Sequence, residues 1–261
     1  MKYSGLFFVS NPTAQIPGSE ALCESVSTGI EQNLQRANRE ESSWSLSHII
    51  FRDIQDAPNT ASSSASTTPS HSYHHLLRLS CFNPDRAYSY IQPRTSGEAT
   101  PNVAQGPIVA MPADQFDQFN QLVLNQWSLL WTPQRALDIP PNFPGFSYKV
   151  AAFTIHIGAL RSRRTGPQTA ATLSPGILVC ISTDILGENE EALKSDDNDL
   201  DYGEIDYSQT QEAIRELWRT MTTGVELGKS EVREVMQAGA EKEQDTEAAV
   251  RMWCEALKLR G

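Results

Sequence analysis

The stretch AAFTIHIGALRSRRTG, residues 151–166, joins an apolar strand pattern to a cluster of arginines. Large apolar residues occupy every second position of its first half, namely Phe153, Ile155 and Ile157. Alternation with a period of two predicts a strand that buries one face, and we expect this strand to span 147–158. A second apolar run, GILVCISTDI at 176–185, follows after a connection rich in Gly, Pro and Thr. The two runs therefore predict neighbouring antiparallel strands.

The arginines Arg161, Arg163 and Arg164 are expected at the exposed tip between these two strands. A hairpin tip lies in solvent, and long charged side chains are hydrated there at little cost. The functional alternative is a contact with an acidic surface, either in another protein or in this chain. Duplex recognition is disfavoured, because only three charges cluster and no aromatic residue lies between them.

The remaining chain alternates in character between short strands and a few helices. Further strands are expected at 3–9, 43–51, 73–82, 87–92, 106–112 and 134–139. Helices are expected at 19–34, 112–131, 208–223 and 229–259. Strands follow one another without regular βαβ units, so the fold class is α+β. We expect an antiparallel β-barrel or strongly curved sheet covered by helices, with a helical C-terminal tail.

The helix expected at 112–131 has the clearest pattern. Its apolar stripe consists of Phe116, Phe119, Val123, Trp127 and Leu130. Pro112 suits a first helical turn, and Asp114 and Asp117 suit the positive end of the helix dipole. This stripe is expected to lie on the sheet.

The domain organisation is expected to be one domain, 1–224, followed by a charged helical tail, 225–261. Within the domain, 56–70 and 93–105 are expected to be soft loops, and 187–207 an acidic loop. The segment 56–70 has almost no apolar bulk, so it cannot offset the entropy cost of ordering and is expected to be disordered.

The charge is strongly asymmetric along the 261 residues. Residues 1–186 hold 12 basic and 13 acidic side chains, whereas 187–261 hold 9 and 19, and the whole chain carries a net charge of −11. Nucleic-acid binding depends on positive charge that releases counterions, so direct nucleic-acid binding is not expected. The apolar run near the N-terminus is too short for a signal peptide or a membrane span. Four separated cysteines favour reduced thiols in a nuclear or cytosolic protein.

No motif points to catalysis, a cofactor or a metal. GxSxG, Walker, GxGxxG and HExxH patterns are all missing. His71, His74 and His75 lack further ligands at metal-binding spacing, and His74 and His75 would point to opposite faces of a strand. A calcium loop starting at Asp197 would need glycine where Tyr202 stands and glutamate where Ser208 stands. We therefore expect no catalytic, cofactor-binding or metal residues and no small-molecule substrate, the alternative being a soluble α+β enzyme whose pocket the motifs do not reveal.

Six segments in this order resemble the family of Mediator complex subunit 20, in the head module of the transcriptional Mediator. They are GLFFV (5–9), LLRLSCF (76–82), GPIVAMPADQFDQFNQLVLNQW (106–127), YKVAAFTIHIGAL (148–160), GILVCIS (176–182) and AIRELWRTM (213–221). The family pattern of a Phe-x-Val-x-Val-Gly strand stands here as Phe153-x-Ile155-x-Ile157-Gly158. The segments 56–70, 187–207 and 228–261 are expected to be additions to the family core.

The resemblance implies an antiparallel β-barrel with helices packed against it. It implies a non-enzymatic structural subunit, without metal or cofactor, that acts as a transcription coregulator of RNA polymerase II in the nucleus. Its implied partners are Mediator subunit 18, as a heterodimer, and Mediator subunit 8, which tethers the pair to the head module.

Overall fold

The computed structural model describes most of the chain. The described residues are 2–40, 43–54, 71–94, 106–141, 145–163, 172–184, 207–239 and 245–258. The chain divides into two compact units. Unit 1 comprises Met1–Trp44, Pro141–Leu160 and Leu173–Gly261, and unit 2 comprises Ser45–Pro140 and Arg161–Thr172. None of the described helices is long and apolar enough to cross a membrane.

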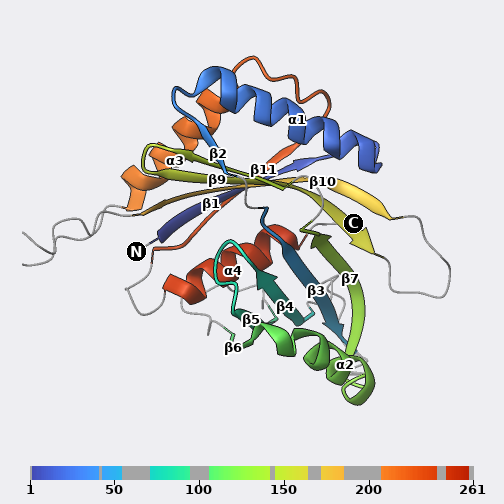
Figure 1. Ribbon diagram of the computed structural model, residues 1–261. Helices are drawn as coiled ribbons and strands as arrows, with labels where there is room; N and C mark the ends of the chain where they lie inside the picture. Colours follow the sequence, from blue (N-terminus) through green and yellow to red (C-terminus); the bar gives the residue numbers. More distant parts are fainter. Residues whose placement is uncertain are drawn as a thin grey trace, which may run out of the picture. The chain divides into compact units, whose positions relative to one another are not determined.

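Unit 1 is a sheet with helices on both faces (Figure 1). Its strands are β1 (Lys2–Ser10), β2 (Asn38–Glu40), β8 (Gly145–Val150), β9 (Phe153–Arg163), β10 (Leu173–Asp184) and β11 (Val232–Met236). The strand order is β11-β1-β10-β9-β8-β2. Strand β1 pairs antiparallel with β10 and β11, and β8 pairs antiparallel with β2 and β9. Its helices are α1 (Ile16–Asn33), α3 (Tyr207–Thr222) and α4 (Asp245–Leu257). Helices α1 and α3 lie on one face and α4 on the other (Figure 1).

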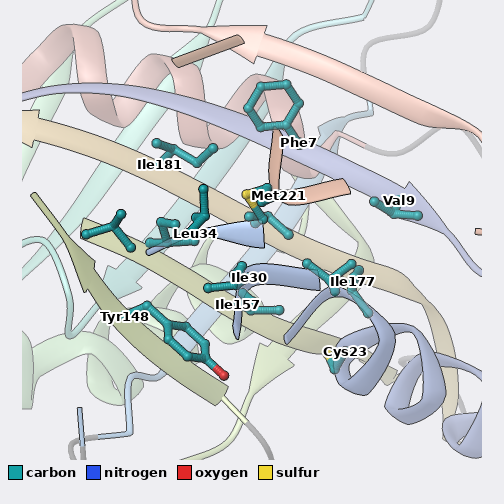
Figure 2. Close-up of a cluster of buried hydrophobic side chains, with 14 of the residues drawn as sticks. Phe7, Val9, Cys23, Ile30, Leu34, Tyr148, Ile157, Ile177, Ile181 and Met221 are labelled. Carbon is teal, nitrogen blue, oxygen red and sulfur yellow. The ribbon is translucent and has the colours of Figure 1, made fainter. Parts of the chain in front are cut away.

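Strand β1 lies between β10 and β11, and it has buried side chains on both of its faces. Phe7 faces α3, where its ring stacks on Trp218 with centroids 4.4 Å apart, while its neighbour Leu6 is buried on the opposite face. Gly5 leaves room for the side chain of Met236 in β11, because a Cβ atom at position 5 would lie 2.6 Å from the Met236 sulfur. Figure 2 shows the apolar cluster that β1 shares with α1, β9 and β10.

Unit 2 is a second stretch of antiparallel sheet. Its strands are β3 (Leu46–Asp53), β4 (Tyr73–Leu79), β5 (Arg86–Gln92), β6 (Ile108–Pro112) and β7 (Trp131–Ile139). The strand order is β7-β3-β4-β5-β6, and the last residues of β9 pair with β7. A 3-10 turn, η1 (Ala113–Gln115), leads into helix α2 (Phe116–Gln126). The α2 side of this sheet buries an apolar cluster consisting of Phe51, Leu76, Ala87, Met111, Phe116 and Val123.

The fold class is α+β with a large antiparallel sheet, as expected, and β9 and β10 are neighbours as the sequence predicted. Of the two predicted sheet forms, the closed barrel is wrong. Among the described strands, β11 pairs only with β1, and β6 pairs only with β5, so the sheet is open. The C-terminal helix is present as α4.

Three predicted elements have different boundaries in the structure. The expected strand at 147–158 is a hairpin of β8 and β9, whose turn consists of Ala151 and Ala152. Strand β9 also continues past Gly158 to Arg163. The expected helix at 112–131 ends at Gln126, because the chain turns there and enters β7. Within the expected helix at 229–259, residues Val232–Met236 instead form strand β11, which pairs with β1, and the helix α4 covers only Asp245–Leu257.

The turn between β8 and β9 contains an alanine with a positive φ, a conformation that suits glycine better. Ala151 has φ of +49° at the first central position of a two-residue turn between the paired residues Val150 and Phe153. A positive φ at this position favours glycine. We predict that Ala151→Gly raises the free energy of unfolding by about 0.5–1 kcal/mol, measured by urea denaturation. Ala152→Gly is the matched control and should lower the free energy of unfolding, because Ala152 does not have a positive φ. Equal effects of the two substitutions would contradict the placement of Ala151 in the positive-φ position of the turn.

Candidate protein-interaction site

The three histidines of the sequence HSYHH each have a different partner. His71 Nδ1 lies 2.8 Å from Oδ1 of Asp53. His74 and His75 point to opposite faces of β4, as predicted for adjacent strand residues: His74 lies on the α2 side, and His75 Nδ1 lies 3.0 Å from Nε2 of His48. These histidines connect neighbouring segments of unit 2.

His74 is buried among aromatic rings. Its ring is near those of Phe51, Phe119, Trp127 and Trp131. Nε2 lies 2.8 Å from Oγ of Ser89, and Nδ1 has no hydrogen-bond partner among the described residues. Burial lowers the pKa of His74 from 6.5 to about 4, because the charged form would be poorly solvated there. His74 is therefore a neutral structural residue at neutral pH.

His48 is also neutral. Its pKa lies well below the ordinary value. Burial is the largest cause, and the nearby His75 and Arg135 add to it. A neutral ring can accept one hydrogen bond and donate another, which suits the contact with His75.

Asp53 ties together segments that are distant in sequence. It accepts hydrogen bonds from Nη2 of Arg94 at 2.7 Å and from the backbone N–H of Ser72 at 3.2 Å, in addition to its contact with His71. Burial opposes ionisation of this carboxyl, but the hydrogen bonds from Arg94, His71 and Ser72 outweigh it and lower the pKa. The carboxylate thus stabilises the ends of β3 and β4.

Two serine–histidine pairs have hydrogen-bond geometry that resembles part of a catalytic triad. Ser147 Oγ lies 2.8 Å from Nδ1 of His156, and Ser89 contacts His74. Ser147 and His156 face each other directly across the β8–β9 ladder, so strand pairing alone explains their contact. Both hydroxyl-bearing residues are buried. A nucleophile must reach its substrate, and these two serines instead form hydrogen bonds with histidine rings on neighbouring strands.

The expectation that the arginines of residues 161–164 lie at an exposed tip is wrong for Arg161. Arg161 is half-buried inside β9, and Asp138 of β7 is its cross-strand partner. Opposite charges in this position stabilise a ladder modestly. Arg161 therefore belongs to the sheet and not to an exposed tip, because β9 continues beyond the apolar alternation. The side chain of Arg163 and all of Arg164 lie outside the described residues, as do most of the acidic loop 187–207 and the segment 56–70.

Exposed apolar side chains gather where α2 ends. Leu129 is 87% exposed and Leu130 is 58% exposed. The carbonyl of Leu130 accepts a hydrogen bond from the N–H of Ile54, itself an exposed apolar residue. The sequence pattern assigned Leu130 to a buried stripe, of which Phe116 and Val123 are buried. Exposed apolar groups of this kind occur in protein-binding surfaces.

The cysteine thiols are mostly inaccessible. Cys23, Cys180 and Cys254 are buried, whereas Cys81 is partly exposed. Burial raises the pKa of Cys23 to about 12 and raises that of Cys254 as well. A buried thiol with a raised pKa is a poor nucleophile.

We predict that a thiol reagent at neutral pH modifies only Cys81 rapidly in the folded protein. The other three thiols should react only after denaturation, so that four modified cysteines per chain are then counted. Counting released chromophore before and after adding guanidinium checks this. In Cys81→Ser the fast reaction should disappear; rapid modification of Cys23 in that variant would contradict the buried placement.

Acid should destabilise the protein through His74. Its pKa is about 4 in the folded state and about 6.5 in the unfolded state. Between these values the unfolded state binds the proton and the folded state does not, so stability falls as pH falls, by up to about 1.4 kcal/mol per pH unit. We predict that His74→Phe removes this part of the pH dependence. Urea unfolding at several pH values should show the stability difference between wild type and variant changing from pH 7 to pH 4, whereas a constant difference would contradict the prediction.

The comparisons with known proteins give a likeness among solved structures and none among family models or curated proteins. No family model matches the sequence, and no curated protein matches it. Among solved structures, a chain of the Schizosaccharomyces pombe Mediator head module aligns with a TM-score of 0.38 and 10% sequence identity. The alignment covers 86% of this chain and 96% of that chain.

Proposed function

We propose that this chain is a non-enzymatic subunit that works by binding other proteins, as a structural component of the Mediator head of the subunit 20 type. The proposal is supported by one observation. The six segments that carry the sequence resemblance supply the interiors of both units, so the resemblance lies in the framework of the fold.

In unit 1, four of these segments meet in one apolar cluster. GLFFV is the centre of β1, YKVAAFTIHIGAL spans β8 and β9, GILVCIS lies in β10, and AIRELWRTM lies in α3. Their buried members include Phe7, Val9, Tyr148, Ile155, Ile157, Ile177, Val179, Ile181, Ile214 and Met221. Residues this far apart in sequence pack together only when the strand order is kept, so the ordered set of segments encodes one arrangement.

In unit 2, the other two segments share the second cluster. LLRLSCF contributes Leu76 from β4, and the long segment 106–127 contributes Met111, Phe116 and Val123 from β6 and α2. These two segments, which follow one another among the six, therefore also pack against each other in the fold.

The proposed work is architectural. The two serine–histidine pairs link neighbouring strands, and the exposed Leu129 and Leu130 supply apolar surface of the kind that a partner covers. In the finer form of the proposal, the chain forms a heterodimer with Mediator subunit 18, and subunit 8 tethers the pair within a nuclear complex that regulates RNA polymerase II transcription.

Co-expression tests this proposal directly. The tagged full chain, produced together with subunits 18 and 8 from the same organism, should co-purify with both as a single species in size-exclusion chromatography at physiological salt. The control replaces this chain with an unrelated tagged acidic protein. Co-purification with neither subunit, at concentrations where the chain is folded by circular dichroism, would overturn the assignment.

A further inference from the structure

We propose that the outer edge of β11 binds an extended segment of another protein, which adds to the sheet as a further antiparallel strand. The segment carries a basic side chain between two apolar ones, in the pattern apolar-x-basic-x-apolar. This goes beyond the proposed function, because it concerns the site and the chemistry of its ligand and holds for any complex in which the chain acts.

The hydrogen-bond pattern shows which backbone groups of β11 face outward. The N–H of Gln237 donates to the carbonyl of Ser4, and the N–H of Ser10 donates to the carbonyl of Glu231. In an antiparallel ladder, residues that bond to the partner strand alternate with residues that do not. The odd-numbered residues of β11 therefore bond to β1, and the even-numbered residues direct their N–H and C=O groups away from it.

These outward residues are Val232, Glu234 and Met236. Among the described strands, only β1 pairs with β11. Three consecutive outward positions offer a row of donors and acceptors at the spacing of a strand. Such an edge is a template for an incoming strand unless it is blocked.

The other edges of the sheet carry features that hinder pairing. At the β6 edge, the same alternation places Pro112 outward, where it has no N–H to donate, and Pro107 precedes the strand. Strand β2 has only three residues, Asn38–Glu40, two of them charged. Short length, charge and proline all protect edges from pairing. Strand β11 contains no proline and has five residues, so it is the edge best suited to accept a strand.

Strand β11 is also held in place before any partner binds. Glu234 Oε1 accepts a hydrogen bond from Nε of Arg215 in α3 at 2.8 Å, and Arg233 Nη2 donates to Oε1 of Glu255 in α4 at 2.8 Å. The two ion pairs lie on opposite faces of the sheet. The carbonyl of Gln237 also accepts a hydrogen bond from the hydroxyl of Tyr3. A fixed strand loses little conformational freedom on binding, which favours association.

The side chains of β11 define the chemistry of the incoming segment. Val232, Glu234 and Met236 share the face that carries α3, since Glu234 binds Arg215 there. Cross-strand neighbours on one face interact most strongly. Apolar side chains therefore fit opposite the 43%-exposed Val232 and opposite Met236, and a lysine or arginine fits opposite the partly exposed carboxylate of Glu234.

A second copy of this chain fits the edge poorly. The register that places Val232 opposite Met236 of a second copy also places two Glu234 residues directly opposite each other, which is unfavourable. Each copy in addition carries a net charge of −11. Self-association through β11 is therefore an alternative outcome of the test and not the proposal.

The test uses the full chain and a capped peptide of sequence Thr-Val-Thr-Lys-Thr-Val-Thr, titrated to millimolar concentration and followed by ¹⁵N NMR. Shift changes should concentrate on β11, and hydrogen exchange should slow at the outward amides of Val232, Glu234 and Met236. The amides of Arg233 and Val235, already bonded to β1, should change little. A peptide with glutamate in place of lysine should bind several-fold more weakly, and Glu234→Gln should reduce that difference.

Val232→Pro removes one outward N–H without removing a bond to β1, and should weaken peptide binding about tenfold. Val232→Thr keeps the N–H and is the matched control. If the proline variant fails to fold, the hydrogen-exchange data on the unmodified chain still test whether the peptide pairs with the edge of β11. The proposal is overturned by no response of the β11 amides at millimolar peptide, by equal binding of both peptides, or by concentration-dependent dimerisation through β11 in the absence of peptide.

Discussion

Burial of β1 on both faces is the constraint on which the rest of unit 1 depends. A strand whose two faces are both apolar needs a cover on each side. Phe7 is covered by Trp218 of α3, and helix α4 packs against β1 as well. Strand β1 also needs a partner along each edge, and β10 and β11 supply them. One short apolar segment thus requires four other elements, α3, α4, β10 and β11, to be in place.

A different constraint operates in unit 2, where polar groups are buried and must be satisfied internally. His48 pairs with His75, His74 with Ser89, and Asp53 with its cationic and backbone donors. Each contact joins neighbouring strands or the segments at their ends. Buried polar groups are costly when unpaired, so these contacts specify which segments adjoin. The burial of His48, His74 and His75 also makes the stability of the unit sensitive to protonation.

The sequence predicted most elements, because apolar spacing with a period of two or four is a strong signal. Strands β1, β9 and β10 and helices α1 and α3 follow from it directly. The turn at Ala151 was missed because it contains neither Gly, Asn nor Pro, the usual turn residues. Strand β11 was missed because Arg233 and Glu234 make it look like a solvated helix, and their helix partners are visible only in the fold. Leu130 continues the spacing of α2 beyond its end, so its exposure could not be inferred. The proposed edge site depends on which backbone N–H and C=O groups of β11 point away from β1, and no sequence motif indicates this.

Unit 1 is assembled from segments that precede and follow Ser45–Pro140, whereas most of unit 2 is that one continuous segment. A ribosome delivers the chain from the N-terminus, and compact regions fold as they emerge. Strand β1 is synthesised before the continuous segment of unit 2, whereas its partner β11 and its covering helix α4 are synthesised after that segment. During translation, β1 must therefore remain without these neighbours, with its apolar face and one edge open to chaperones, until β11 and α4 leave the exit tunnel.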